Sequence, residues 1–387
     1  MNIDALFDWL VDGAPGAPTP AHAVARIGPE LAAAGIPVAR IEAFVRTLHP
    51  HIAGRSFVWV PGKPVDVREN SFAYLTSETF LTSPAADVFR SGKPVRKRLS
   101  RGSTSLGSAM LDALVADGFT DFYAGPLRFI SGQVHAMTFA TRAPEGFTDE
   151  HIAAIDRLLR PLSRIAEIFA LSRTAVNLLN TYVGHNAGER ILSGQIQRGE
   201  TTTIRAVIWF SDLRGFTSLT GILGANEIVH VLNELFDAQV PCIEKHGGEV
   251  LKFMGDGLLA IFPVSTDEAS VRARCDAALD AARESFETLA AINAKRAERQ
   301  RGEIRFGLAL HVGDIAYGNI GGSGRLDFTC IGPAVNVAAR LESLTSKLGR
   351  SLVTSSEFAR YASKPLSSVG RFELKGVTGD AEVFEPV

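Results

Sequence analysis

Apolar residues recur with two different periods along this chain, and the two periods predict a mixture of helices and strands. At residues 148–169 and 225–246 the apolar positions repeat every three or four residues, as on one face of an amphipathic helix. At residues 122–130 and 134–142, two strand-like runs flank Ser-Gly-Gln, which predicts a β-hairpin. The pattern therefore predicts an α+β fold.

Changes in this pattern divide the chain into four expected segments, and its 387 residues suffice for two or three domains. A helix is expected to begin near Pro37 and to run towards Leu48, and residues 184–203 are expected to form a loop because they are rich in glycine and polar residues. The segments are an N-terminal helical segment (residues 1–49), an α+β domain (50–147), a linker helix with a transducer segment (148–199) and a second α+β domain (200–387).

The stretch at residues 204–220 carries the first candidate chemistry. Its run Ile-Arg-Ala-Val-Ile-Trp-Phe predicts a buried strand that ends at Asp212. Gly215 lets the backbone of the next turn approach a ligand, and the turn leads into a helix whose first amides favour anions. A carboxylate beside such a turn suggests a nucleotide-bound divalent metal; the alternative is an Asp that only caps the helix. The turn residues expected to bind substrate are Leu213, Arg214, Gly215, Phe216 and Thr217.

Two further stretches place polar residues at defined positions. Residues 248–253 and 258–262 predict two strands joined through Met-Gly-Asp-Gly, so Asp256 lies at a hairpin tip. Asp is also a common turn residue, which is the alternative interpretation of Asp256. Asn336 and Arg340 are four residues apart in a predicted helix and project from one face. On their own, a surface Asn and Arg at this spacing indicate no function.

Charge and composition exclude several classes of protein. The formal net charge is −2 and the sequence has no long Lys/Arg run, so the basic surface of a nucleic-acid-binding protein is missing. The N-terminus is acidic and amphipathic, unlike a signal peptide, and no apolar run reaches the length of a membrane span, so we expect a cytoplasmic location. Cys242, Cys275 and Cys330 are far apart in the sequence, and we expect reduced thiols in the core.

Together, three motifs make residues 200–387 similar to the catalytic domain of the class III nucleotidyl cyclases. The motifs are Phe-Ser-Asp-Leu-Arg-Gly-Phe-Thr, Leu-Lys-Phe-Met-Gly-Asp-Gly and Gly-Pro-Ala-Val-Asn-Val-Ala-Ala-Arg-Leu-Glu, in the order and with the internal spacing of that family. The resemblance implies a mixed, mainly antiparallel sheet with helices and a ferredoxin-like βαββαβ core. It also implies a head-to-tail homodimer with two shared active sites.

The resemblance further implies roles for individual residues. Asp212 and Asp256 match the two carboxylates that bind two divalent ions, Mg²⁺ or Mn²⁺, which prefer hard oxygen ligands. In the family, the ribose 3′-hydroxyl of the substrate attacks the α-phosphorus in line and expels pyrophosphate. Arg340 matches the residue that neutralises the α-phosphate in the transition state, and Asn336 matches the residue that orients the ribose. Lys375, in Glu-Leu-Lys-Gly, resembles a contact to the terminal phosphate.

Lys252 and Thr329 match the positions that select the base. Adenine presents an acceptor at N1 and a donor at its 6-amino group, so a lysine that donates and a hydroxyl that accepts are complementary to it. Guanylyl cyclases of the family carry an acid where this chain has Lys252, so the expected substrate is ATP and the expected product is 3′,5′-cyclic AMP. Thr329 replaces the more familiar Asp, as in the subgroup that includes bicarbonate-stimulated adenylyl cyclases.

The segment before the linker resembles a GAF-type sensor domain in the order of its elements and in its closing hairpin and helix. This resemblance implies regulation by an unidentified small molecule or ion, for which the sequence shows no binding motif. The helix that continues to residue 183 is typical of a dimeric signalling linker. Its apolar stripe would equally pack on its own domain.

Three other interpretations remain open. One is a guanylate cyclase, and another is a diguanylate cyclase, because residues 247–251 partly match the Gly-Gly-Glu-Glu-Phe signature. The last two positions of that signature differ here, and the other motifs would be unexplained. The third is a catalytically inactive cyclase-like module that binds nucleotides for regulation. Such modules usually lose a metal-binding acid or the transition-state arginine, and this chain retains both acids and Arg340.

Overall fold

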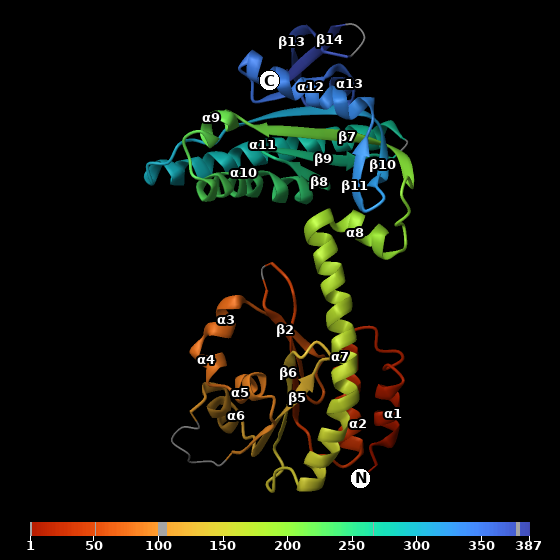
Figure 1. Cartoon of the computed structure of the whole chain (residues 1–387), viewed down its shortest axis with the longest axis vertical. Helices are drawn as coiled ribbons and strands as arrows, with labels where there is room; N and C mark the ends of the chain where they lie inside the picture. The colour runs from red at the N-terminus through yellow and green to blue at the C-terminus, as the bar shows by residue number, and fades with distance from the viewer. Residues whose placement is uncertain (1, 51, 100–106, 266, 377–379) are drawn as a thin grey trace. The chain divides into compact units, whose positions relative to one another are not determined.

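The computed structural model describes residues 2–50, 52–99, 107–265, 267–376 and 380–387 (Figure 1). Its contacts divide the chain into two compact units, Met1–Leu178 and Leu179–Val387. The first unit contains the expected N-terminal segment, the sensor-like segment and most of the linker helix. The second unit contains the end of that helix and the cyclase-like segment.

The first unit is built on a six-stranded antiparallel sheet in the order β3-β2-β1-β6-β5-β4. The predicted hairpin is confirmed as β5 and β6. The strands are β1 (Arg40–Arg46), β2 (Gly54–Trp59), β3 (Asp66–Asn70), β4 (Val95–Arg98), β5 (Asp121–Arg128) and β6 (Val134–Thr141). Helices α1 (Asp4–Val11), α2 (Pro20–Ala33) and α7 (Asp149–Val183) cover one face, and α3 (Phe72–Thr76), α4 (Glu78–Leu81), α5 (Pro84–Ser91) and α6 (Ala109–Ala116) lie on the other side (Figure 1).

The helix expected from Pro37 towards Leu48 is wrong, because β1 occupies most of this stretch. β1 pairs with β2 on one side and with β6 on the other. Its buried residues Ile41 and Ala43 flank the more polar Glu42, which is the two-residue period of a strand. Two neighbouring strands supply hydrogen bonds and packing that a helix here would lose, so pairing in the sheet overrides the local signal.

One long helix, α7, begins in the first unit and ends in the second. The helix predicted to run from residue 148 to residue 183 is therefore confirmed, and Pro161 lies inside it without ending it. Its inner residues, such as Ile155 and Leu158, belong to the core of the first unit. The loop expected at residues 184–203 is wrong in part, because α8 (His185–Leu192) forms there and packs small residues into the second unit.

The second unit contains the predicted βαββαβ core, in the order β7-α10-β8-β9-α11-β10. Its sheet runs β13-β14-β12-β10-β7-β9-β8, with β11 paired to β10, and among the strand pairs of the described residues only β10–β12 is parallel. The mixed, mainly antiparallel sheet is thus confirmed. The strands are β7 (Thr201–Leu213), β8 (Glu249–Met254), β9 (Gly257–Pro263), β10 (Phe306–Gly322), β11 (Arg325–Ile331), β12 (Leu352–Ser355), β13 (Leu366–Glu373) and β14 (Asp380–Pro386). The remaining helices are α9 (Phe216–Thr220), α10 (Ala225–Lys245), α11 (Glu268–Glu298), α12 (Pro333–Leu348) and α13 (Ser356–Tyr361).

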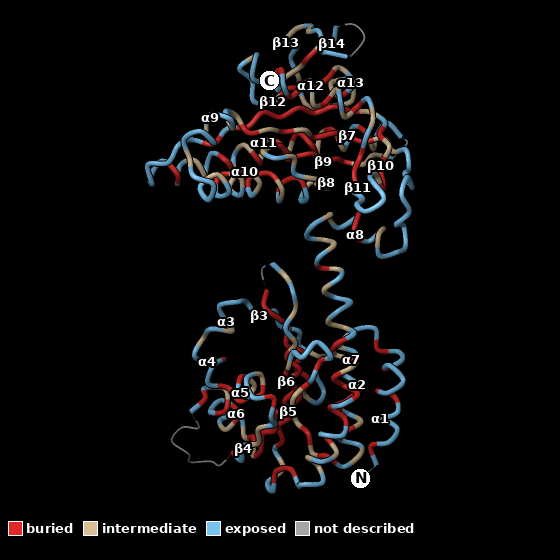
Figure 2. Tube along the Cα trace, in the orientation of Figure 1, coloured by how far each residue is buried: buried red, intermediate tan, exposed pale blue. Residues whose placement is uncertain are grey.

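Helices bury both faces of the central strands of this sheet. α10 and α11 pack against one side of β7, β9 and β10, whereas α8 and α12 pack against the other. Figure 2 shows buried residues concentrated along these strands. The three cysteines are buried and free, as expected. Among the helices that the structure describes, none is both long and apolar enough to cross a membrane.

Two buried histidines make the stability of this fold depend on pH. Burial lowers the pKa of His135 in β6 and of His311 in β10, in each case to about 4. In the unfolded chain a histidine has a pKa of about 6.5, so the unfolded state binds more protons below that value. Stability is therefore lost as the pH falls from about 6.5 towards 4, by up to about 3 kcal/mol for each histidine.

We expect the unfolding temperature of the full chain to fall between about pH 7.5 and about pH 5, and His311→Asn to reduce that fall. Asparagine does not titrate and keeps a polar group near the Ser355 hydroxyl, which lies 2.8 Å from His311 Nδ1. His230→Asn, at an exposed position of α10, is the matched control. Scanning fluorimetry at both pH values measures the effect. An unchanged pH dependence in His311→Asn would show that this residue is not responsible.

Candidate active site

The central strand β7 ends at Asp212 and Leu213, and Asp212 lies between two glycines. It is opposite Gly257 of β9 and Gly307 of β10. A Cβ atom at Gly257 would lie 3.1 Å from Asp212 Oδ1, and one at Gly307 would lie 2.5 Å from Glu342 Oε1. A side chain at either position would crowd a carboxylate, so the glycines keep space open around these acids.

Asp256 reaches the same place from the turn between β8 and β9. The backbone N–H of Leu213 donates to the Asp256 carbonyl at 3.3 Å, which holds the hairpin tip against the end of β7. Burial, followed by the charge of Asp256, raises the pKa of Asp212 to about 6. The sequence places each acid at a turn, and the structure brings the two turns together.

These two acids suit a divalent cation. Their repulsion and partial burial disfavour the doubly charged state, and a hard cation would offset both effects. Within the described ranges, no three His, Cys, Asp or Glu side chains gather into a metal-binding group. Mg²⁺ is usually bound by one or two carboxylates and completes its coordination with waters and substrate phosphates. The donor set therefore fits a metal ion that binds together with a nucleotide.

A third carboxylate, Glu342 of α12, is not among the residues predicted from sequence. Burial, followed by the charge of Asp212, raises the pKa of Glu342 to about 7. Its Oε1 lies 3.9 Å from Arg214 Nη1 and accepts a hydrogen bond from the Thr345 hydroxyl at 3.3 Å. The available signal was its place in the third motif, two residues after Arg340. The sequence alone does not show that the helix that carries Glu342 packs beside β7, so it does not place Glu342 near Asp212.

The turn after β7 offers more backbone than side chain to a ligand. Gly215 has φ +72°, in the left-handed region, and immediately precedes α9. Leu213 is buried in the core, and Phe216 packs against the same core. The guanidinium of Arg214 bonds back to α12, and its backbone N–H donates to a carbonyl near β10. Thr217 is exposed. Of the five predicted turn residues, Gly215 and Thr217 are therefore the most accessible.

The two residues expected to select the base, Lys252 and Thr329, lie on β8 and β11, which contact each other. Lys252 Nζ lies 3.2 Å from Asp327 Oδ2. Thr329 is 3% exposed, and its hydroxyl has no hydrogen-bond partner among the residues that the structure describes. Leaving a buried polar atom without a partner costs about 1–3 kcal/mol. A ligand that bonds to the Thr329 hydroxyl would remove that cost.

Asn336 and Arg340 lie on an exposed side of α12, one turn apart, as the spacing predicts. In the part of the chain that the structure describes, neither side chain makes a hydrogen bond or an ion pair. The charges that shift the pKa of Asp212 come from Asp256 and Arg214. The structure therefore does not bring Arg340 to the two acids of the same chain.

Lys375 lies in an exposed turn after β13. Residues 377–379, which follow it, are outside the described ranges. No described contact joins Lys375 to the acids at the end of β7, so the structure leaves its predicted role as a phosphate contact untested.

Comparison with known proteins identifies this region. Residues 200–384 match the family described as the adenylate and guanylate cyclase catalytic domain. An adenylate cyclase of Anabaena cylindrica is 33% identical over 177 residues, which cover 44% of this chain and 34% of that protein. Adenylate cyclase 1 of Rhizobium meliloti is 29% identical over 287 residues, which cover 72% of this chain and 40% of that protein. A solved bacterial light-regulated adenylyl cyclase is 27% identical and covers 59% of this chain and 64% of its own, with a TM-score of 0.47.

The segment at residues 200–384 thus matches the model of the adenylate and guanylate cyclase catalytic domain, and this is the segment that contains the three motifs. The chain spans about a third to two fifths of the length of the two curated relatives. The family name covers cyclases of both ATP and GTP. The residues expected to contact the base are therefore the ones that bear on the choice between ATP and GTP.

Glu342 offers a test of the buried cluster beside Asp212. Glu342→Gln keeps the shape of the side chain and an acceptor for Thr345, so we expect it to cost less than about 1 kcal/mol of unfolding free energy. Glu342→Ala removes the acceptor and leaves a cavity beside Arg214, so we expect a cost of about 2–4 kcal/mol. Urea denaturation followed by circular dichroism measures both variants. Equal losses would mean that the charge, and not the shape, holds the cluster together.

Proposed function

We propose that the protein is an adenylate cyclase that converts ATP to 3′,5′-cyclic AMP and pyrophosphate under the control of its first unit. The observation that carries the proposal is the pair Asp212 and Asp256, which meet at the end of β7, where burial and then the charge of Asp256 raise the pKa of Asp212 to about 6. Two relatives named as adenylate cyclases support the choice of reaction.

The site residues have separate tasks in this reaction. Divalent ions held by Asp212 and Asp256 would supply Lewis-acid chemistry, which lowers the pKa of the ribose 3′-hydroxyl and polarises the phosphates. The 3′-oxygen forms a bond to the α-phosphorus, the bond to the β-phosphate oxygen breaks, and the hydroxyl proton goes to solvent. Arg340 neutralises the charge that develops on the α-phosphate, and Asn336 orients the ribose one helical turn away.

Lys252 and Thr329 support ATP over GTP. The Lys252 ammonium has three donors, so it can bond to adenine N1 while it keeps its contact with Asp327. The Thr329 hydroxyl, which has no partner in the described chain, can accept from the 6-amino group. Guanine presents a donor at N1 and an acceptor at O6, so it would leave these groups mismatched. A site with such unpaired groups rejects the wrong ligand by up to ~10⁴-fold.

The separation of Arg340 from the two acids supports a site shared between subunits. Arg340 and Asn336 are exposed and unpaired in the described chain, whereas Asp212 and Asp256 lie together at the end of β7. In a head-to-tail homodimer, α12 of one subunit would complete the site at β7 of the other. Two-fold symmetry then produces two equivalent sites.

The outer face of α7 supports a dimeric linker between the two units. Its exposed residues follow the three-and-four spacing of a two-stranded coiled-coil seam. They are Ile168, Leu171, Ala175, Leu178 and Tyr182. The inner face of α7 packs in the core of the first unit. The apolar residues of the inner face thus pack on their own domain, and those of the outer face are available for the proposed coiled coil. The likeness of the first unit to a GAF-type domain stays a prediction.

The full chain incubated with ATP and Mn²⁺ should release cyclic AMP and pyrophosphate, and with GTP it should release at least about 100-fold less cyclic product. Asp256→Asn should reduce turnover by more than about 100-fold, because it removes one charged metal ligand. Its unfolding temperature should not fall, because a hairpin tip contributes little packing and the change removes a charge that repels Asp212. Chromatography of the products measures the rates.

The matched control for Asp256→Asn is Asp314→Asn, at an exposed carboxylate of β10. This variant should keep the wild-type rate. Comparable product from GTP would favour a guanylate cyclase, and no product from either nucleotide would favour an inactive regulatory module. An active Asp256→Asn variant would refute the metal assignment.

Asp212→Ala and Arg340→Ala should each be inactive alone, and mixing them should restore activity. In a mixed dimer, one site receives both altered residues while the other receives an intact acid and an intact arginine. With free and equal exchange, about half of the dimers are mixed and each has one working site, so we expect about a quarter of the wild-type rate. Labelled subunits verify the exchange. If exchanged chains stay inactive, each site is built within one subunit.

A further inference from the structure

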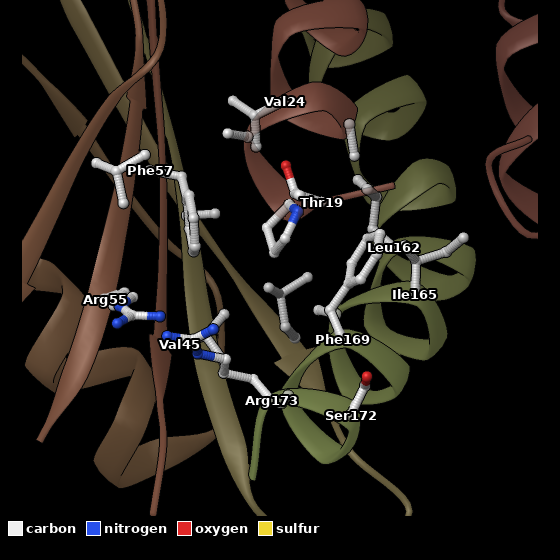
Figure 3. Close-up of a pocket in the computed structure, with 18 of the residues that line it drawn as sticks. Thr19, Val24, Val45, Arg55, Phe57, Leu162, Ile165, Phe169, Ser172 and Arg173 are labelled. Carbon is white, nitrogen blue, oxygen red and sulfur yellow. The ribbon is translucent and has the colours of Figure 1, made fainter. Parts of the chain in front are cut away.

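A cavity of about 420 Å³ lies in the first unit, between its sheet and helices α2 and α7 (Figure 3). Apolar side chains form most of its wall, among them Val24 of α2, Phe57 of β2, and Leu162, Ile165 and Phe169 of α7. Its volume falls in the range of pockets that hold small molecules, roughly 300–1,000 Å³. Every residue that lines it belongs to the first unit, so it is separate from the proposed cyclase site.

One side of the cavity carries two arginines. In Figure 3, Arg55 of β2 and Arg173 of α7 point toward the same region, beside Val45. Arg55 Nη2 makes an ion pair with Glu69 Oε1 at 2.6 Å. Arg173 makes no ion pair or hydrogen bond with any residue that the structure describes. Arg173 is an exposed residue, and its partial burial, followed by the charge of Arg55, lowers its pKa. Two guanidinium groups and one carboxylate leave this region positively charged.

We propose that the cavity binds a small amphipathic anion, with an apolar body and a single carboxylate. The apolar body would contact the aliphatic and aromatic wall and leave water. The carboxylate would accept two hydrogen bonds from Arg173 and offset its repulsion with Arg55. A neutral apolar molecule would leave that repulsion in place. A nucleotide would set several polar groups against an apolar wall, which is costly.

The cavity is also placed to act on the linker helix. Leu162, Ile165, Phe169 and Arg173 follow one another at spacings of three or four along α7, and all of them line the cavity. The exposed apolar residues of the proposed coiled coil occupy other positions of the same helix. An anion that draws Arg173 towards the sheet would change how α7 packs, and with it the seam. The binding site stands by itself, and only an effect on the cyclase rate rests on the proposed function.

Binding is tested on the full chain with 8-anilinonaphthalene-1-sulfonate, an apolar probe with one fixed negative charge whose fluorescence rises in apolar surroundings. We expect one saturable site in each chain, from which dodecanoate displaces the probe. N-phenyl-1-naphthylamine, a neutral probe of similar shape, reports on the apolar wall alone.

Arg173→Ala should weaken binding of the anionic probe and of dodecanoate by at least about tenfold, and should change binding of the neutral probe by less than about twofold. Arg173→Lys should restore most of the affinity, because it keeps the charge. Ala170→Trp, which fills the cavity, should abolish binding of all three molecules. Arg272→Ala, at an exposed position of α11, is the matched control. Circular dichroism verifies that each variant is folded.

The proposal is wrong if the wild type, Arg173→Ala and Ala170→Trp bind the anionic probe equally. It is also wrong if the wild type binds no probe and Ala170→Trp converts a dimer to a monomer in light scattering, since a second copy would then occupy this surface.

Dodecanoate should change the rate of cyclic AMP formation at least about twofold in the wild type and not in Arg173→Ala. Binding without a change in rate would refute the link to α7. If no cyclic nucleotide forms at all, the proposed function fails while the binding result stands.

Discussion

The second unit depends on the antiparallel pairing of β7 with β9 and β10. This pairing sets the register that places Asp212 between Gly257 and Gly307. Helices bury both faces of β7, so a shift of one residue would move every side chain of the strand to the opposite face. The packed core therefore sets the geometry of the site. The turn after β7 and the turn between β8 and β9 add the remaining groups.

At the end of that strand, the protein holds carboxylates where burial and mutual repulsion oppose their charge. The raised pKa values of Asp212 and Glu342 show that ionising these acids costs free energy in the folded protein. This arrangement therefore does not stabilise the fold. Arg214 offsets part of that cost, and a cation bound with a nucleotide would offset more. Perturbed acids in this setting are typical of functional sites. The places of Asp212 and Asp256 in turns are one reason to interpret them as ligands of a cation. The cost of ionising them is a second, physical reason.

Helix α7 connects the two proposals. Its inner residues build the core of the first unit and line the cavity, and its outer residues form an exposed apolar seam. A helix has few ways to satisfy two packing surfaces at once, so a change on one surface alters the other. The same element would therefore carry a ligand signal along the chain without any contact between the ligand and the nucleotide.

Local periodicity and spacing determined much of this protein from sequence: the hairpin of β5 and β6, the long helix α7 and the three motifs are all encoded in short stretches, and the βαββαβ core followed from the resemblance that those motifs carry. The strand β1 was missed because its partners β2 and β6 come later in the chain, and β6 lies about ninety residues away. Glu342 could be recognised as part of the acidic cluster only from the structure, in which α12 packs beside β7. The cavity required α2, the sheet and α7 to meet. Burial, charge proximity and pKa are properties of contacts between distant residues, so only the tertiary structure decided them.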